Sequence, residues 1–119
     1  FETDIPRDLP QISLDQTKIR QALFNLLRNA QESIQHTHGK ILFSASAVPD
    51  GVQITISDNG CGMTEDQIEN AFRPFVTYKP GGTGLGLAVT RQIIEAHQGT
   101  LCVESTPKEG TSFYIFLPE

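Results

Sequence analysis

The chain lacks the sequence features of membrane-spanning, nucleic-acid-binding and metal-cluster proteins. No apolar run approaches the roughly 18 residues that a membrane span requires, so we expect no direct membrane contact. Lys and Arg number 9 against 14 Asp and Glu, which gives a net charge of −5. The absence of a basic cluster argues against a nucleic-acid partner. The two cysteines, Cys61 and Cys102, form no metal or redox motif, and we predict free thiols in a reducing cytosol.

The length of 119 residues gives room for one domain with one core. The opening residues read as part of something longer, so we interpret residues 1–119 as a fragment of a larger protein. We expect the domain to be cytoplasmic and monomeric. The sequence leaves open whether the parent protein is anchored in a membrane.

Helical and strand patterns are intermixed along the chain. After an extended opening between Pro6 and Pro10, helices are expected at 16–35, 65–72 and 87–97, and strands at 40–47, 51–57, 101–105 and 112–117. Asp15 and Thr64 are expected to cap the first two helices, and Gln98-Gly99 to end the third. The core-facing stripe of the first helix is expected at positions 19, 23, 26, 27, 30 and 34. These patterns predict an α+β two-layer sandwich, with a largely antiparallel sheet covered on one face by about three helices.

Two glycine-rich turns stand where backbone can meet a ligand. The first, 58–62, opens with Asp58, whose carboxylate can accept a hydrogen bond from an exocyclic amine. Gly60 and Gly62 indicate a backbone that approaches a large flat ligand, although Asp-Asn-Gly is also an ordinary turn sequence. The second turn, 82–86, leads into a helix, whose N-terminus presents unpaired N–H groups to an anion. Together the turns predict a nucleotide site, with the base at the first and the phosphates at the second.

The second turn fits neither of two common phosphate-binding motifs. A dinucleotide fingerprint needs a preceding strand and a different glycine spacing, and a P-loop ends in Gly-Lys-Ser/Thr. We interpret residues 73–86 as a mobile loop or lid that feeds the helix N-terminus. Lys79 on this lid is either a phosphate contact or an exposed lysine without a role.

The first helix carries Asn25 and Asn29 on one stripe, although asparagine costs about 0.5 kcal/mol relative to alanine in a helix. One interpretation is a solvated helix edge. The other is a set of amide oxygens for Mg²⁺, which accepts neutral oxygen ligands and holds phosphates. His36, His38 and His97 have no metal spacing and no nucleophile beside them, so no function is assigned to them.

The order of these segments resembles the GHKL superfamily of gyrase, a heat-shock chaperone, sensor histidine kinases and a mismatch-repair ATPase. Residues 21–30 resemble the N box, 58–62 the first glycine box, 72–75 the F box, 82–87 the second glycine box and 110–113 the closing Gly-Thr-x-Phe segment. Within the superfamily, residues 12–118 are similar to the catalytic ATP-binding domain of a sensor histidine kinase of the nitrogen-regulation or oxygen-sensor type. Tyr78 departs from the threonine found in many relatives of this type.

The resemblance implies a Bergerat fold with an ATP lid at about 64–86 and a role for each matching residue. Asp58 would hold the adenine amine, and Thr111 would support the same base. Asn29 would bind Mg²⁺ beside Asn25, and both are implied in catalysis. Phe72 and Phe75 would anchor the lid. The remaining nucleotide contacts would come from Gly60, Gly62, Lys79, Gly82, Thr83, Gly84, Leu85 and Gly86.

The resemblance also implies a protein-histidine kinase that transfers the γ-phosphoryl group of ATP to a histidine on a separate dimerisation domain, from which a response regulator receives it. Hydrolytic relatives carry a glutamate at the position of Asn25, and an amide cannot take up a proton from water. We therefore expect negligible hydrolysis. No histidine of the chain precedes an acidic residue, as the accepting histidine of the family does. One alternative is a hydrolytic GHKL ATPase, which steady ATP turnover by the isolated domain would indicate. The other is a degenerate or anti-sigma-like regulator, which an absence of nucleotide binding would indicate.

Overall fold

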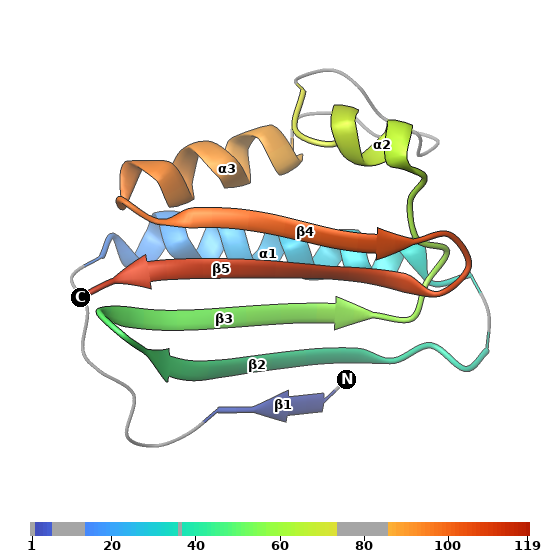
Figure 1. Cartoon of the computed structure of the whole chain (residues 1–119). Helices are drawn as coiled ribbons and strands as arrows, with labels where there is room; N and C mark the ends of the chain where they lie inside the picture. The colour runs from blue at the N-terminus through green and yellow to red at the C-terminus, as the bar shows by residue number, and fades with distance from the viewer. Residues whose placement is uncertain (1, 6–13, 36, 74–85) are drawn as a thin grey trace.

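The computed structural model describes residues 2–5, 14–35, 37–73 and 86–119. The elements of this part of the chain are β1 (Glu2–Asp4), α1 (Gln16–Ser33), β2 (Ile41–Val48), β3 (Gly51–Asp58), α2 (Glu65–Asn70), α3 (Gly86–Ala96), β4 (Thr100–Thr106) and β5 (Gly110–Pro118). Figure 1 shows α1 crossing behind the sheet, with α3 alongside it. The predicted opening at 6–10 and the predicted lid residues 74–85 lie outside the described residues.

The strands form one sheet in the order β1-β2-β3-β5-β4. All neighbours are antiparallel except β1 and β2, which pair in parallel through Glu2 and Leu42, Thr3 and Phe43, and Asp4 and Ser44. The prediction of a mostly antiparallel sheet is confirmed. The sequence does not predict β1, because three residues carry too little alternation to distinguish a strand from any extended segment.

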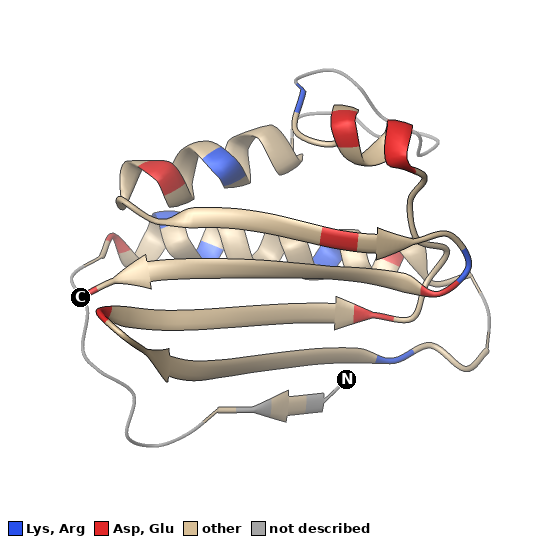
Figure 2. Ribbon diagram, viewed as in Figure 1, with Lys and Arg blue, Asp and Glu red and all other residues tan. Residues whose placement is uncertain are grey.

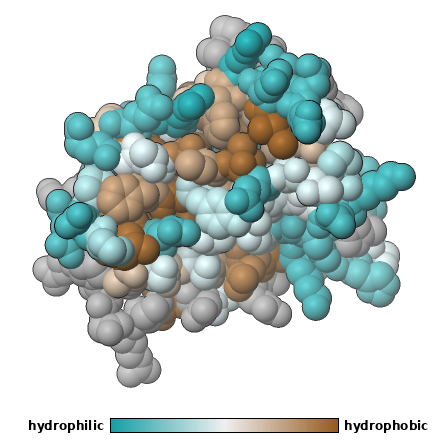
Figure 3. Space-filling model, viewed as in Figure 1, coloured by the Kyte–Doolittle hydropathy of each residue, from teal (hydrophilic) through white to brown (hydrophobic). Residues whose placement is uncertain are grey.

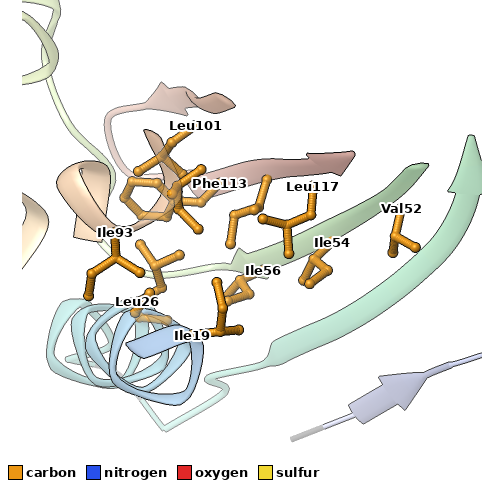
Figure 4. Close-up of a cluster of buried hydrophobic side chains, with 13 residues drawn as sticks. Ile19, Leu26, Val52, Ile54, Ile56, Ile93, Leu101, Phe113 and Leu117 are labelled. Atoms are coloured by element: carbon orange, nitrogen blue, oxygen red, sulfur yellow. The ribbon is translucent and has the colours of Figure 1, made fainter. Parts of the chain in front are cut away.

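One face of the sheet builds the core. Buried residues alternate along β3 and β5, and the register sets them opposite one another as Val52 and Leu117, Ile54 and Ile115, and Ile56 and Phe113. Figure 4 shows Ile19 and Leu26 of α1 and Ile93 of α3 packed against these strand residues. The predicted two-layer α+β fold is confirmed, although α2 contributes no buried residue.

The other face of the sheet carries half-buried residues such as Thr55 and Tyr114. Figure 3 shows hydrophilic and hydrophobic residues mixed on this side of the molecule. Ser57 and Ser112 lie here as cross-strand partners, with their hydroxyl oxygens 2.8 Å apart. Within the described ranges, no helix combines the length and the apolar character needed to cross a membrane.

Both predicted helix caps are confirmed. The Lys18 N–H donates to Oδ1 of Asp15 at 3.1 Å, and Thr64 forms a capping box with Gln67. After the end of α3, Gln98 adopts the left-handed backbone conformation, with φ of 63°. Gly99 is needed for a different reason, since a Cβ there would meet the carbonyl oxygen of Phe116.

The first helix ends two residues earlier than predicted, because Ile34 adopts an extended conformation with φ −88° and ψ 113°. In the predicted stripe Ile19, Leu26 and Ala30 are buried, whereas Leu23, Leu27 and Ile34 are only partly covered. Ala22 and Ser33 are buried instead. The buried stripe is therefore rotated toward the small residues Ala22, Ala30 and Ser33.

Candidate functional site

Asp58 ends β3 and is a buried residue, with 9% of its surface exposed. The Gly60 N–H donates to its Oδ1 at 2.8 Å, and the Ser33 hydroxyl lies 3.1 Å from the same oxygen. All hydrogen bonds between Asp58 side-chain atoms and described residues thus end on Oδ1. Among the described residues, no group donates to Oδ2.

The turn after Asp58 is fixed by hydrogen bonds on its far side. The side chain of Asn59 accepts from the Lys40 N–H at 2.7 Å and donates to the His38 carbonyl at 2.8 Å. The Cys61 N–H donates to the Ser33 carbonyl at 2.9 Å. The turn therefore holds its shape through contacts within the protein.

Gly60 and Gly62 are both explained by close approach to other parts of the chain. A Cβ at Gly60 would meet Ser33, including its carbonyl oxygen at 2.6 Å. Gly62 has φ of 68°, and a Cβ there would meet the Thr106 carbonyl. These contacts give each glycine a structural role that the sequence pattern did not predict, and their predicted contact with a ligand stays a prediction.

Thr111 lies directly opposite Asp58 on the neighbouring strand β5, and its side chain is likewise buried. Its hydroxyl oxygen is 2.7 Å from that of Ser105, which also donates to the Gly110 carbonyl and accepts from the Met63 N–H. The structure thus brings Asp58 and Thr111 together at one end of the sheet, as expected for two groups that serve the same base.

Asn25, Asn29 and Ser33 form a row on α1, because residues four apart lie on one helix face. Ser33 contacts Asp58, while the Asn25 amide lies 3.4 Å from the Gly86 carbonyl at the start of α3. At 1.5 Å per residue the row is about 12 Å long. It connects the buried carboxylate with the N-terminal end of α3.

Ser33 is the residue that sequence reasoning missed. It lies one helical turn beyond Asn29, and its burial fraction equals that of Asp58. The i, i+4, i+8 spacing of three polar residues was visible in the sequence and would have indicated it. The predicted core stripe stopped at apolar residues and so passed over it.

Phe72 of the predicted lid anchor is half-buried and packs edge-on against Phe113, with ring centroids 6.5 Å apart. The Arg91 guanidinium lies 5.0 Å from the centroid of the Phe72 ring. The start of the lid is therefore attached to the core and to α3. Other predicted site residues lie outside the described residues: Phe75, Lys79, Gly82, Thr83, Gly84 and Leu85.

Charge is not concentrated around this grouping. Figure 2 shows acidic positions on α2 and at the end of β3, and basic positions spread along α1 and α3. Among the described residues, no group of three or more His, Cys, Asp and Glu side chains could hold a metal ion.

Two hollows flank α1. One of about 260 Å³ adjoins the glycine turn and is lined by Ser33, Gln35, Gly60, Cys61 and Lys108. The other, about 360 Å³, includes Leu23 and Phe24 in its lining and contains none of the predicted site residues.

Cys61 and Cys102 are free and exposed, which confirms the prediction of unpaired thiols.

A helix-covered antiparallel sheet with a buried strand-end carboxylate and an amide-bearing helix defines a class: the two-layer α+β nucleotide-binding domains. The family model for "Histidine kinase-, DNA gyrase B-, and HSP90-like ATPase" matches residues 14–119. The chain belongs to this family, and its relatives place it among the catalytic domains of sensor histidine kinases.

Curated relatives include sporulation kinase B of Bacillus subtilis, 43% identical over 104 residues, covering 87% of this chain and 24% of the relative. Sensor histidine kinase ZraS of Escherichia coli is 43% identical over 110 residues, covering 92% of this chain and 23% of the relative. The chain thus spans about a quarter of the length of these relatives.

Solved structures share the fold. The catalytic domain of histidine kinase ThkA has a TM-score of 0.83 and 36% identity, covering 98% of this chain and 75% of that chain. Full-length ShkA, solved in complex with AMPPNP, has a TM-score of 0.85 and 30% identity, covering 99% of this chain and 26% of that chain.

Proposed function

We propose that this chain is the ATP-binding domain of a protein-histidine kinase, which binds ATP with Mg²⁺ and donates the γ-phosphoryl group to a histidine on another domain. The observation that carries the proposal is the buried Asp58 carboxylate, which has Oδ1 occupied from within the protein and Oδ2 available. Membership of an ATPase family that includes histidine kinases supports ATP as the ligand.

At the base end, Oδ2 of Asp58 accepts a hydrogen bond from the 6-amino group of adenine. Guanine presents a carbonyl oxygen at that position, which would repel an ionised carboxylate, since both groups are acceptors. Thr111 would serve a neighbouring ring nitrogen by turning its hydroxyl hydrogen away from Ser105. Its location opposite Asp58 in the sheet supports this role.

At the phosphate end, Asn29 would hold Mg²⁺ through its amide oxygen, with Asn25 beside it. Mg²⁺ takes one or two protein oxygens and completes its shell with substrate phosphates and water, so a site without a carboxylate cluster fits its chemistry. When bound, the ion neutralises phosphate charge. The N–H groups at the start of α3 and the predicted contacts at Lys79, Gly82, Thr83, Gly84, Leu85 and Gly86 would hold the phosphates.

Transfer is favoured over hydrolysis by Asn25. Its amide lies 3.4 Å from the Gly86 carbonyl as a donor, and an amide cannot accept the proton that water must lose on attack. In transfer, the bond between the γ-phosphorus and the bridging oxygen breaks, a bond to an imidazole nitrogen forms, and ADP leaves. Phosphoryl transfer depends mainly on position and charge neutralisation, so the protein needs no strong base for it.

The accepting histidine would belong to a helical dimerisation domain of the same kinase, and a response regulator would receive the phosphoryl group next. The names of the relatives support this assignment, since they are sensor and sporulation kinases. A cytoplasmic location of this domain is part of the same proposal.

The test is to mix the chain with labelled ATP, Mg²⁺ and the histidine-bearing domain of its parent protein, and to measure acid-labile phosphate on that domain. We expect label on the separate domain and none on this chain. Steady ATP turnover without a histidine domain would instead indicate a hydrolytic ATPase. Absence of ATP binding would indicate a regulator without kinase activity.

A further inference from the structure

The Ser33 hydroxyl is a buried polar group at the last residue of α1. Its oxygen lies 2.8 Å from the Ala30 carbonyl and 3.1 Å from Oδ1 of Asp58. A hydroxyl has one hydrogen, and both of these neighbours are acceptors when the carboxylate is ionised. The contact with Asp58 orients the carboxylate when the hydrogen is given to Oδ1, and the inference below requires that arrangement.

That contact determines how the carboxylate is presented. Ser33 and the Gly60 N–H meet the same oxygen from α1 and from the glycine turn, so both the rotation of the carboxylate and the identity of its occupied oxygen are fixed. No completely buried polar side-chain atom of the described residues lacks a partner. Oδ2 accepts nothing from those residues, so it is the oxygen that a ligand would meet.

We propose that Ser33 is a positioning residue for base recognition: it holds Oδ1 of Asp58 so that Oδ2 meets the 6-amino group of adenine. This inference rests on the proposed function, because it requires a purine at Asp58. Ser33 acts through Asp58 and does not contact the ligand in this proposal.

The end of α1 is anchored without this hydroxyl. The Ser33 carbonyl accepts from the Cys61 N–H at 2.9 Å, and the Ile34 N–H donates to the Gln31 carbonyl at 3.3 Å. Alanine is also the best helix former, so Ser33→Ala is expected to fold. Loss of the hydroxyl should therefore affect base selectivity more than stability.

The experiment compares two nucleotides by calorimetry with Mg²⁺ present: ATP, and purine riboside triphosphate, which lacks the 6-amino group. For Ser33→Ala we expect binding of ATP to weaken about tenfold and binding of the other nucleotide to stay unchanged, because only the amine uses the positioned oxygen. The ratio of the two affinities is a readout that a general packing defect would not move.

The matched control is Ser57→Ala. Ser57 directly precedes Asp58, and its hydroxyl oxygen lies 2.8 Å from that of Ser112 in a part-buried contact. This contact lies on the open face of the sheet, away from the Asp58 carboxylate. Its removal should leave both affinities unchanged.

Two results would contradict the inference. An unchanged affinity ratio in Ser33→Ala, which includes equal weakening of both nucleotides, would overturn it alone. If the wild-type chain bound both nucleotides equally, the contact between Asp58 and the amine would be wrong, and the proposed base recognition would fail with it.

Discussion

The two ends of the polar row on α1 are built differently. At the Ser33 end, Asp58 is buried, and its Oδ1 receives the Gly60 N–H at 2.8 Å and faces the Ser33 hydroxyl at 3.1 Å. At the Asn25 end, the hydrogen bond across to α3 is longer, 3.4 Å to the Gly86 carbonyl, and Asn25 and Asn29 are only half-buried.

Under the proposed function, this difference would divide recognition of the base and of the phosphates between the two ends. The carboxylate end is organised within the protein before any ligand binds, which is what discrimination between bases requires. In the proposed function, the amide end supplies neutral oxygens to Mg²⁺, which in turn binds the phosphates. Changes at the two ends should therefore have different signatures.

Asp58→Asn should have the largest effect. It replaces a carboxylate acceptor with an amide that can present a donor to the adenine amine. We expect the dissociation constant for ATP to rise at least about 100-fold, which is a loss of about 3 kcal/mol in binding free energy. Calorimetry measures the affinity, and circular dichroism should show an intact fold. Unchanged affinity would contradict the claim that the Asp58 carboxylate recognises the base.

Gly62→Ala tests whether the carboxylate end depends on close backbone packing. Alanine would have to adopt φ of 68° and place its Cβ against the Thr106 carbonyl, so we expect a loss of about 2 kcal/mol or more in the free energy of unfolding. Urea unfolding measures it. Gly86→Ala is the matched control, because a Cβ at Gly86 meets nothing within 4 Å; equal losses in the two variants would argue against the packing explanation.

Asn29→Ala tests the amide end. With Mg²⁺ present we expect ATP binding to weaken about tenfold, since a metal ligand is lost, or about 1.4 kcal/mol. In EDTA the affinity should match that of the wild-type chain. An equal loss in both conditions would indicate a packing defect and not a metal ligand.

His97→Ala changes the junction of α1 and α3 away from both ends. The Asp15 N–H donates to Nε2 of His97 at 3.0 Å, and Nδ1 lies 2.8 Å from the Ile93 carbonyl, so a neutral ring protonated on Nδ1 satisfies both. We expect a loss of about 1 kcal/mol in stability, measured by urea unfolding. ATP affinity should not change; a large loss of affinity would mean that the junction shapes the site.

Periodicity was enough to predict the helices and the four long strands. Apolar residues alternate along β3 and β5, and the alternate positions are the buried ones. The helical spacing of the apolar residues likewise marks three buried positions of α1, which are Ile19, Leu26 and Ala30. The ends were less accurate. The first helix stops at Ser33, whose carbonyl accepts from the Cys61 N–H, and no local pattern records a contact between such distant residues.

The roles predicted for the site residues stay predictions, and the structure bears on their placement. Asp58, Thr111, Asn25 and Asn29 were named from their residue types and motif order, and the structure brings Asp58 beside Thr111. Ser33 could not be assigned a partner from the sequence, since its contact with Asp58 joins residues 25 positions apart. Gly60 and Gly62 were attributed to a ligand, whereas their close contacts within the protein arise only when the turn packs on Ser33 and Thr106.

The most direct test of the account is an NMR titration of the chain with ATP and Mg²⁺, because the central claim is that one ligand reaches both ends of the row. We expect the largest shifts at the backbone amides of Ser33, Gly60 and Thr111 together with the side-chain amides of Asn25 and Asn29. Shifts confined to one end, or centred on the hollow lined by Leu23 and Phe24, would contradict it.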